Sequence, residues 1–340
     1  MKQFTTRRDF LRQSAGGLAA LSALLYTRQG GALWGAPAPR FAGVFAILQT
    51  PFNASDQLDW EDLAREVEFC LRAGAHGLVW PQLAAEFYLL SEEERRRGAE
   101  TILRAAGGSK PVVIGVQAPT SSLALQFAQH AEQHGASAVI ALPPYLGAMG
   151  LETAANYYRA LAAGVKLPIF IQNSGSPWGP ALPAELVIRL ARENPQLAYI
   201  KEEVAPVARR IGEYAQSGVM KGIFSGNAGR DLLDELAHGS AGTMPACAFL
   251  DVDVRVYDLA AQGKAQQARE VFEKLLPMIN MEEIYGLAFT KEVLVRRGVF
   301  KTAKLRGVTG GGLDDQNRKE LDAWWNELAP YLIDKSDPAK

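Results

Sequence analysis

The sequence contains few of the residues from which metal sites and disulfides are built. Of 340 residues, two are cysteine and four are histidine. Cys70 and Cys247 have apolar neighbours and belong to no Cys-x-x-Cys pair, so we expect two buried free thiols. The histidines show no metal-ligand clustering with carboxylates along the sequence, so we expect neither a metal nor another cofactor. They are His76, His130, His134 and His238.

An excess of either charge is also missing. The 36 Lys and Arg residues nearly balance the 37 Asp and Glu residues, which gives a formal net charge of -1. No stretch beyond the N-terminus concentrates basic residues, and this excludes the charge pattern of proteins that bind nucleic acid or an acidic membrane. The 48% hydrophobic and 21% charged residues are typical of a globular protein. We therefore expect a small molecule as the partner.

The N-terminus has the tripartite pattern of an export signal. Thr6-Arg-Arg-Asp-Phe-Leu-Arg12 is a twin-arginine motif, and an uncharged apolar run follows at 15–26. This run is too short to cross a bilayer, which requires about 20 residues. We therefore predict a signal peptide over 1–40 that is cleaved around 36–38. The mature protein is then periplasmic or secreted, without membrane association. The alternative is a basic first helix of the folded domain.

From residue 43 onward, short apolar runs alternate with stretches of helical periodicity, which predicts repeated βα units and a parallel sheet. The apolar runs are 44–48, 77–80, 111–116, 138–142, 168–172, 197–201, 222–225 and 242–245. The helical stretches are 60–73, 91–106, 120–135, 151–164, 182–193, 205–216 and 228–238. Eight such strands favour a closed (β/α)₈ barrel, a TIM barrel, over an open sheet. Residues 250–335 are helical in pattern, so we predict one domain, 41–335, with a C-terminal helical extension.

Lys201 is the most informative single residue. It ends the sixth apolar run, and in such barrels the reacting side chains project from the carboxyl ends of the strands. Removal of a lysine from water disfavours its charged form, and the free amine can attack a carbonyl. The position also fits a rim lysine that pairs with Glu202 or Glu203. Strand alternation puts Glu203 on the same face as Lys201 if the strand continues that far.

Four motifs then occur in a fixed order along the chain. They are Thr50-Pro-Phe52 after the first strand, Leu90-Ser-Glu-Glu-Glu-Arg95 at a helix start, Pro143-Pro-Tyr145 after the fourth strand, and the sixth-strand lysine. Together they resemble the dihydrodipicolinate synthase and N-acetylneuraminate lyase superfamily of class I aldolases, over nearly all of 41–335. This resemblance implies that Lys201 forms an imine with a 2-oxo acid. It also implies a homo-oligomer, either a tetramer or a dimer.

The chain differs from that superfamily at the positions that determine which reaction is catalysed. Gln82-Leu-Ala-Ala-Glu86 stands in place of Gly-Thr-Thr-Gly-Glu, so the two hydroxyls that hold the substrate carboxylate are missing. Gln172-Asn-Ser-Gly175 replaces Tyr-Asn-x-Pro, and Leu146 replaces a second tyrosine. Aldol cleavage needs a base for the C4 hydroxyl, and a carboxamide cannot act as one. We therefore expect elimination: the iminium at C2 acidifies the C3 proton, a carboxylate removes it, and hydroxide leaves C4.

A narrower resemblance points to the same reaction. The chain is similar to the 2-keto-3-deoxy-L-arabonate dehydratases in the glutamate before Phe87, in segment 142–148, in Gln172, and in Lys-x-Glu at 201–203. Gly239-Ser-Ala-Gly-Thr-Met244 and Leu276-Pro-Met-Ile-Asn280 also match. The resemblance implies dehydration of a 2-keto-3-deoxy sugar acid, with Glu203 or Glu86 handling protons.

Other polar side chains near strand ends are candidate substrate ligands, although each also fits a turn residue. They are Thr50, Tyr145, Gln172, Asn173, Ser225 and Asn227. The backbone amides of the turn at 222–229 are candidates for holding a carboxylate. We expect nearby aromatic residues to form the walls of the site or a subunit contact. They are Trp80, Phe87, Tyr88, Tyr145 and Trp178.

Three functional hypotheses follow from these residues. The first is a lyase that dehydrates a 2-keto-3-deoxy sugar acid through an imine on Lys201. The second keeps the imine but breaks or makes a carbon bond, as a pyruvate-dependent aldolase or synthase of the dihydrodipicolinate synthase or N-acetylneuraminate lyase type. The third is an exported, non-catalytic protein that binds a 2-oxo acid.

Overall fold

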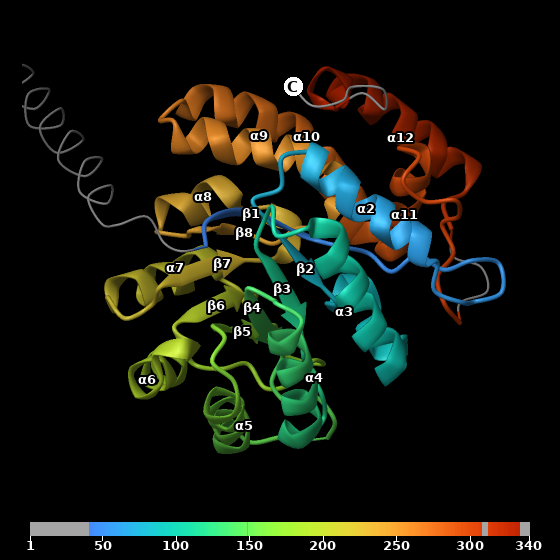
Figure 1. Ribbon diagram of the computed structural model, residues 1–340. Helices are drawn as coiled ribbons and strands as arrows, with labels where there is room; N and C mark the ends of the chain where they lie inside the picture. Colours follow the sequence, from blue (N-terminus) through green and yellow to red (C-terminus); the bar gives the residue numbers. More distant parts are fainter. Residues whose placement is uncertain (1–40, 148, 308–311, 334–340) are drawn as a thin grey trace, which may run out of the picture. The chain divides into compact units, whose positions relative to one another are not determined.

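In the computed structural model, eight parallel strands close into a barrel in which each strand pairs with the next and β8 pairs with β1 (Figure 1). The strands are β1 (Gly43–Ile47), β2 (Gly77–Trp80), β3 (Val112–Gly115), β4 (Ala138–Ala141), β5 (Ile169–Asn173), β6 (Tyr199–Glu202), β7 (Gly222–Ser225) and β8 (Gly242–Thr243). The predicted (β/α)₈ barrel is confirmed, and every predicted strand is present.

The structure describes residues 41–333 except 148 and 308–311, and these residues belong to one compact unit. The predicted twin-arginine signal over 1–40 lies outside the described residues, as do the last two residues of the predicted domain at 334–335. Within the described part, no helix combines the length and the apolar character that a bilayer span requires.

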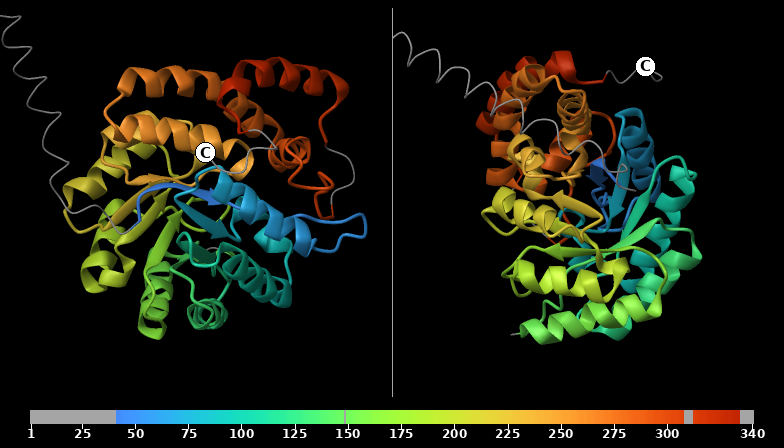
Figure 2. Two further views of the ribbon diagram at one scale, coloured as in Figure 1. Left: turned by 45° about the horizontal axis from the view of Figure 1, so that its top comes forward. Right: turned by 90° about the vertical axis from the view of Figure 1, so that its left-hand side faces the viewer.

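One helix follows each strand, and three further helices complete the described part of the chain. The helices are α2 (Trp60–Arg72), α3 (Glu92–Ala106), α4 (Ser121–Gln133), α5 (Leu151–Gly164), α6 (Ala184–Glu193), α7 (Val207–Gln216), α8 (Leu232–Ala237), α9 (Leu250–Ala261), α10 (Ala265–Tyr285), α11 (Leu287–Arg296) and α12 (Asp315–Leu328). Short 3₁₀ turns are η1 (Leu83–Ala85), η2 (Phe87–Leu89), η3 (Pro195–Leu197), η4 (Asn227–Gly229), η5 (Cys247–Phe249) and η6 (Ala329–Tyr331). Helices α9 to α12 gather on one side of the barrel, as the predicted extension requires (Figure 2).

Local sequence explains where the early helices begin. The Asp59 carboxylate accepts the backbone N–H groups of Glu61 and Asp62, which would otherwise lack partners at the start of α2. Ser91 and Glu94 form a reciprocal capping box at the start of α3. These caps fix the directions in which the β1–α2 and β2–α3 loops leave the barrel.

The barrel interior is packed with apolar side chains rather than open. The inward residues are Phe41, Phe45, Ile47, Val79, Val113, Ala138, Ile140, Phe170, Tyr199, Phe224 and Met244. Their rings meet edge to face, for example Phe45 and Phe224 with centroids 5.0 Å apart. Because side chains alternate along a strand, the next inward positions of β5 and β6 are Gln172 and Lys201. The interior therefore changes from apolar to polar at the carboxyl ends of these strands.

Candidate active site

Three predicted site residues meet at the carboxyl ends of β5 and β6. Gln172 and Lys201 are directly paired in the parallel register of these strands. The Lys201 side chain is only 3% exposed, and its Nζ lies 3.0 Å from Oε1 of Glu203. The other carboxylate oxygen, Oε2, accepts a hydrogen bond of 2.7 Å from Nε2 of Gln172. One carboxylate therefore bridges a buried amine and a buried carboxamide.

The backbone explains why Glu203 faces Lys201. The N–H of Glu203 donates to the carbonyl of Asn173 at 3.0 Å, so the pairing of β5 with β6 continues one residue beyond the assigned strand. The alternation of side chains therefore extends to position 203, and Tyr199, Lys201 and Glu203 share one face. Lys201 is thus buried at the strand end, and its ion-pair partner is Glu203 rather than Glu202.

A glycine makes room for this carboxylate. A Cβ atom at Gly226 would lie 2.2 Å from Oε1 of Glu203, closer than atoms approach without displacement. The following residue, Asn227, donates from Nδ2 to the backbone carbonyl of Glu203 at 3.2 Å. Asn227 and Ala228 adopt left-handed backbone conformations, with φ of 52° and 55°. The turn after β7 is therefore shaped around Glu203, whereas sequence reasoning proposed Asn227 and the backbone amides of this turn as substrate ligands.

Asn173 lies on the opposite face of the strands from Lys201. Its Nδ2 donates to the Glu202 carboxylate at 3.0 Å, and its Oδ1 accepts the N–H of Leu182 at 2.8 Å. The same carboxylate accepts the Tyr214 hydroxyl at 2.6 Å and pairs with Arg210 at 3.1 Å. Burial, together with the charge of Glu202, raises the pKa of Tyr214. Asn173 thus holds a buried ion pair together, and the structure does not place it with Lys201.

Ser225 also faces outward, toward α8. Its hydroxyl contacts the carboxylate of Glu235 and lies 3.0 Å from Oγ1 of Thr243. Burial raises the pKa of Glu235 to about 7. The neighbouring inward residue is Phe224, which belongs to the barrel interior. The structure therefore does not bring the predicted substrate ligand Ser225 to Lys201.

Glu86 and Thr50 stabilise the loop after β2. Glu86 forms a buried ion pair with Lys291 of α11, and burial lowers the pKa of Lys291 against the opposing effect of Glu86. The Thr50 hydroxyl donates to the carbonyl of Ala85 at 2.6 Å and accepts from the Trp80 indole at 3.1 Å. Their contacts among the described residues do not include Lys201. The predicted proton-handling role of Glu86 thus has no support from its contacts.

Four of the five predicted wall residues form one aromatic group. Phe87 lies 5.5 Å from Tyr145 and 5.9 Å from Trp178, measured between ring centroids. Tyr88 stacks on Trp178 at 5.2 Å. These rings come from the loops after β2, β4 and β5, and burial raises the pKa of the Tyr145 hydroxyl. The fifth residue, Trp80, lies apart and packs against Gly98 of α3.

Three buried glutamines were missed by sequence reasoning. Gln49, Gln82 and Gln117 follow β1, β2 and β3, and each is completely buried. Nε2 of Gln82 donates to Oε1 of Gln117 at 3.3 Å, and Nε2 of Gln117 donates to the carbonyl of Pro81 at 2.9 Å. Within the described residues, the side-chain carbonyl oxygens of Gln49, Gln82 and Gln172 have no donor. A glutamine one or two residues after an apolar run is the signal that could have identified them.

The prediction about histidines is wrong for one pair. Glu100 of α3 lies 3.0 Å from Nε2 of His130 on α4 and 3.7 Å from Nε2 of His134, the residue that caps the end of α4. The glutamate comes from the preceding helix, so spacing along the sequence does not reveal the cluster. These three side chains are metal-ligating types whose ligand atoms all lie within 4.8 Å of one another.

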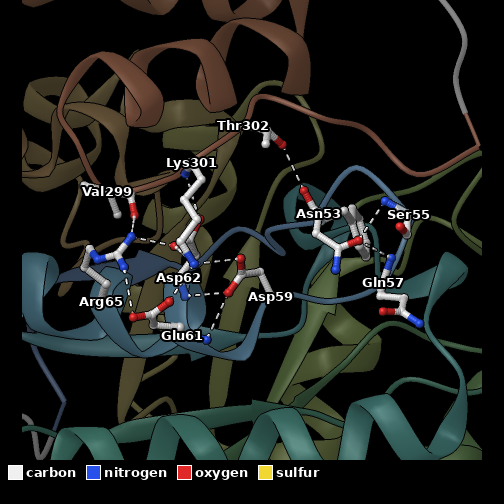
Figure 3. Close-up of polar contacts among 11 residues, drawn as sticks. Asn53, Ser55, Gln57, Asp59, Glu61, Asp62, Arg65, Val299, Lys301 and Thr302 are labelled. Atoms are coloured by element: carbon white, nitrogen blue, oxygen red, sulfur yellow. Dashed lines mark hydrogen bonds and ion pairs between the residues drawn. The ribbon is translucent and has the colours of Figure 1, made fainter.

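Another cluster, of three acidic residues, is neutralised by the amine of a lysine. Lys301 reaches Asp59 at 3.0 Å, Glu61 at 2.6 Å and Asp62 at 3.4 Å (Figure 3). The hydrogen bonds to Glu61 and Asp59 raise the pKa of Lys301. This cluster fastens the segment after α11 to the start of α2.

The two cysteines are buried and free, as predicted. The Cys247 thiol donates to Oε1 of Glu66 at 2.9 Å. Burial raises the pKa of Cys247 and also that of Glu66. The thiol therefore stays protonated and acts as a hydrogen-bond donor inside the protein.

Comparison with known proteins identifies the family. Residues 40–325 match the dihydrodipicolinate synthetase family. The chain belongs to this family. Crystal structures of its members have the same fold, for example dihydrodipicolinate synthase from Rhodopseudomonas palustris, with a TM-score of 0.76, 26% identity, and coverage of 84% of this chain and 97% of that one.

The relatives of this chain carry the names of different reactions. L-2-keto-3-deoxyarabonate dehydratase of Azospirillum brasilense is 29% identical over 87% of this chain and 97% of its own length. A probable 2-dehydro-3-deoxy-D-pentonate aldolase of Escherichia coli is 27% identical over 73% of this chain and 83% of its own length. The family is one of lyases, and both dehydratase and aldolase names occur among these relatives.

Proposed function

We propose that this protein is a Schiff-base-forming lyase that dehydrates a 2-keto-3-deoxy sugar acid. The observation that carries the proposal is the buried Lys201 amine, 3.0 Å from the Glu203 carboxylate that Gln172 holds from its other side. In this arrangement a nucleophile and a proton acceptor lie within hydrogen-bond distance of each other. No further group is needed for imine formation.

Imine formation uses the amine and the carboxylate together. Glu203 accepts a proton from Lys201, and the free amine attacks the C2 carbonyl of the substrate to form a carbinolamine. Glu203 then returns the proton to the carbinolamine hydroxyl, which leaves as water. The product is an iminium at C2, which makes the C3 proton acidic. Glu203 thus acts first as a proton acceptor and then as a proton donor.

Elimination then needs one base and one leaving group. Glu203 removes the C3 proton, the electron pair forms the C3–C4 double bond, and the hydroxyl leaves C4 as water with the proton that Glu203 gives up. Hydrolysis of the conjugated imine by water releases Lys201 and an unsaturated 2-oxo acid that has lost one water overall. Gln172 lacks the acidic hydroxyl of the tyrosine that the superfamily carries there. It can donate to a departing hydroxyl, but it cannot take the C4 hydroxyl proton that aldol cleavage must remove.

The buried glutamines support a hydroxyl-rich substrate. The carbonyl oxygens of Gln49, Gln82 and Gln172 are buried acceptors without donors in the described structure. A buried acceptor without a partner costs about 1–3 kcal/mol. Hydroxyl groups of a sugar acid supply such donors, whereas pyruvate has none. Of the three, Gln172 is the one that the strand register pairs with Lys201, and its free acceptor favours a polyhydroxylated 2-oxo acid over pyruvate.

The competing function is a pyruvate-dependent aldolase or synthase. The aldolase and synthase names among the relatives favour it. The products separate the two reactions, because dehydration keeps all substrate carbons in one molecule and cleavage releases pyruvate and an aldehyde. We expect incubation with 2-keto-3-deoxy pentonates to yield a dehydrated product, measured by mass spectrometry. Pyruvate as the main product would reject the dehydratase.

Borohydride trapping tests the imine itself. We expect reduction in the presence of the sugar acid to attach it to Lys201, detected by intact mass and peptide mapping. Lys201→Arg keeps the positive charge and should lose the adduct, whereas Lys221→Arg, at the other end of the neighbouring strand, should keep it. Binding without any adduct would reject both enzyme functions and support a non-catalytic binding protein.

We also propose that residues 1–40 direct the protein through twin-arginine export and that the mature protein is a tetramer or a dimer. The Thr6–Arg12 motif supports the first proposal, and the family resemblance supports the second. Cell fractionation of the wild type against Arg7→Lys/Arg8→Lys tests export. Light scattering of the purified protein tests assembly, and a monomer would reject it.

A further inference from the structure

Helices α3 and α4 carry a cluster that the proposed function does not use. Glu100 projects from α3, His130 lies in the last turn of α4, and His134 caps the end of that helix. The same carboxylate oxygen, Oε1 of Glu100, lies 3.0 Å from Nε2 of His130 and 3.7 Å from Nε2 of His134. The three side chains are 35%, 16% and 41% exposed, in that order. They are partly shielded but reachable from solvent.

The hydrogen bonding of His134 determines which of its nitrogens is free. Nδ1 lies 2.8 Å from the backbone carbonyl of His130. A carbonyl can only accept, so Nδ1 carries the hydrogen. In the neutral ring, Nε2 then presents a lone pair toward a carboxylate oxygen. This contact needs a positive charge, either as a proton on Nε2 or as a metal ion between the two atoms, and a backbone contact that orients a histidine in this way is typical of metal-bound histidines.

We propose that Glu100, His130 and His134 bind Zn²⁺. Two imidazoles and one carboxylate form a ligand set suited to zinc rather than to Mg²⁺ or Ca²⁺, which prefer oxygen ligands alone. Zinc bonds of about 2.0–2.1 Å in a tetrahedron place ligand atoms about 3.3 Å apart. The observed separations of 3.0 and 3.7 Å lie on either side of this value. The exposed side leaves the fourth position to water.

The acidic cluster near Lys301 differs from the cluster of Glu100, His130 and His134 in how its negative charge is balanced. Asp59, Glu61 and Asp62 also gather within ligand distance, but the Lys301 amine already neutralises them (Figure 3). In the α3–α4 cluster, the positive charge would have to come from protonated histidine or from a metal. Zinc would also tie two consecutive helices together, because its ligands come from both. Bound zinc should therefore stabilise the folded protein.

Zinc titration of the full chain, purified without a polyhistidine tag, tests this proposal. We expect one Zn²⁺ per chain in competition with a chromophoric chelator. His134→Ala and Glu100→Gln should each weaken binding at least tenfold. His238→Ala is the matched control, because His238 also caps a helix, α8, and pairs with a carboxylate, that of Asp234, but this pair includes no second histidine. This control should bind zinc as the wild type does.

Cobalt and thermal unfolding provide independent readouts. Co²⁺ in the same site should give the visible absorption of a low-coordinate ion, and His130→Asn should remove it. Zinc should raise the unfolding temperature of the wild type and of His238→Ala, but not that of His134→Ala. Absence of zinc binding by the wild type would overturn the proposal. Unchanged binding by the His130→Asn/His134→Ala double variant would overturn it equally.

Discussion

Strands β5 and β6 carry polar side chains on both faces, and the two faces differ in how fully these groups are paired. On the outward face, the Glu202 carboxylate accepts hydrogen bonds from Asn173, from Tyr214 and from two backbone N–H groups. On the inward face, Lys201 and Gln172 share the one carboxylate of Glu203, and Oε1 of Gln172 has no donor in the described structure. Fully paired groups hold the fold, and incompletely paired groups are available to a ligand.

The largest expected effect is on the inward face. Lys201→Arg should lower kcat/KM by roughly 10⁴-fold or more, because a guanidinium stays protonated and cannot form an imine. Its charge still faces Glu203, so the free energy of unfolding in urea should change by only about 1 kcal/mol. Turnover within tenfold of the wild type would refute the role of the amine.

A pair of neighbouring substitutions sharpens the comparison. Glu203→Gln should lower kcat by about 10²- to 10⁴-fold, because proton transfer is lost, and it should also lower the free energy of unfolding, because the buried Lys201 amine loses its ion-pair partner. Glu202→Gln should leave Arg210 without its ion-pair partner and lower the free energy of unfolding by about 3–5 kcal/mol. Steady-state kinetics and urea denaturation of both variants measure the two effects. Equal losses of activity and stability in both variants would break the distinction between the faces.

Substitution of Glu86 tests whether this residue, predicted to be catalytic, instead stabilises the fold. Glu86→Gln should destabilise the protein by about 3 kcal/mol or more, because Lys291 is then a buried charge without a partner. The double variant Glu86→Leu/Lys291→Met should recover most of this stability, since it removes both charges. Kinetics of the stable double variant then isolate catalysis, and a loss comparable to that of Glu203→Gln would restore the predicted role.

The smallest effect concerns pH and the outward residue Glu235. Its pKa is raised in the folded protein from 4.5 to about 7, so the folded state binds more protons than the unfolded state in this interval. The stability that it contributes is complete below about pH 4.5 and is lost as the pH rises through about 7, at most about 3 kcal/mol. Glu235→Gln should flatten this decline in urea unfolding measured from pH 4.5 to 8. An identical pH slope in the variant would contradict the assignment.

The barrel could be predicted from the sequence because its signals are local. Each strand is a short apolar run, and each helix has its own periodicity and, in α2 and α3, its own cap. Lys201 and Glu203 could be placed on one face for the same reason, because strand alternation operates over two residues. The same rule, applied to Phe224 and Ser225, would have directed Ser225 outward. A position at the end of a strand was therefore not enough to identify a substrate ligand, because it does not say on which face the side chain lies.

The remaining parts of the site depend on contacts between distant segments. Lys291 follows Glu86 by more than two hundred residues, and only the packing of α11 brings them together. Glu100 meets His130 and His134 because α3 and α4 are neighbours around the barrel, not because of any spacing in the sequence. Such pairs appear only after the tertiary structure is known. The buried glutamines are intermediate, since their positions were visible but their missing donors were not.

The proposed chemistry depends on the absence of a side chain at Gly226. A single methyl group at this position would occupy the volume that the Glu203 carboxylate needs beside Lys201. The proposed activity therefore depends on a residue that offers no functional group of its own. A mutational library that varies only the reactive side chains would overlook it, while one that varies the turn after β7 would find position 226 among the least tolerant.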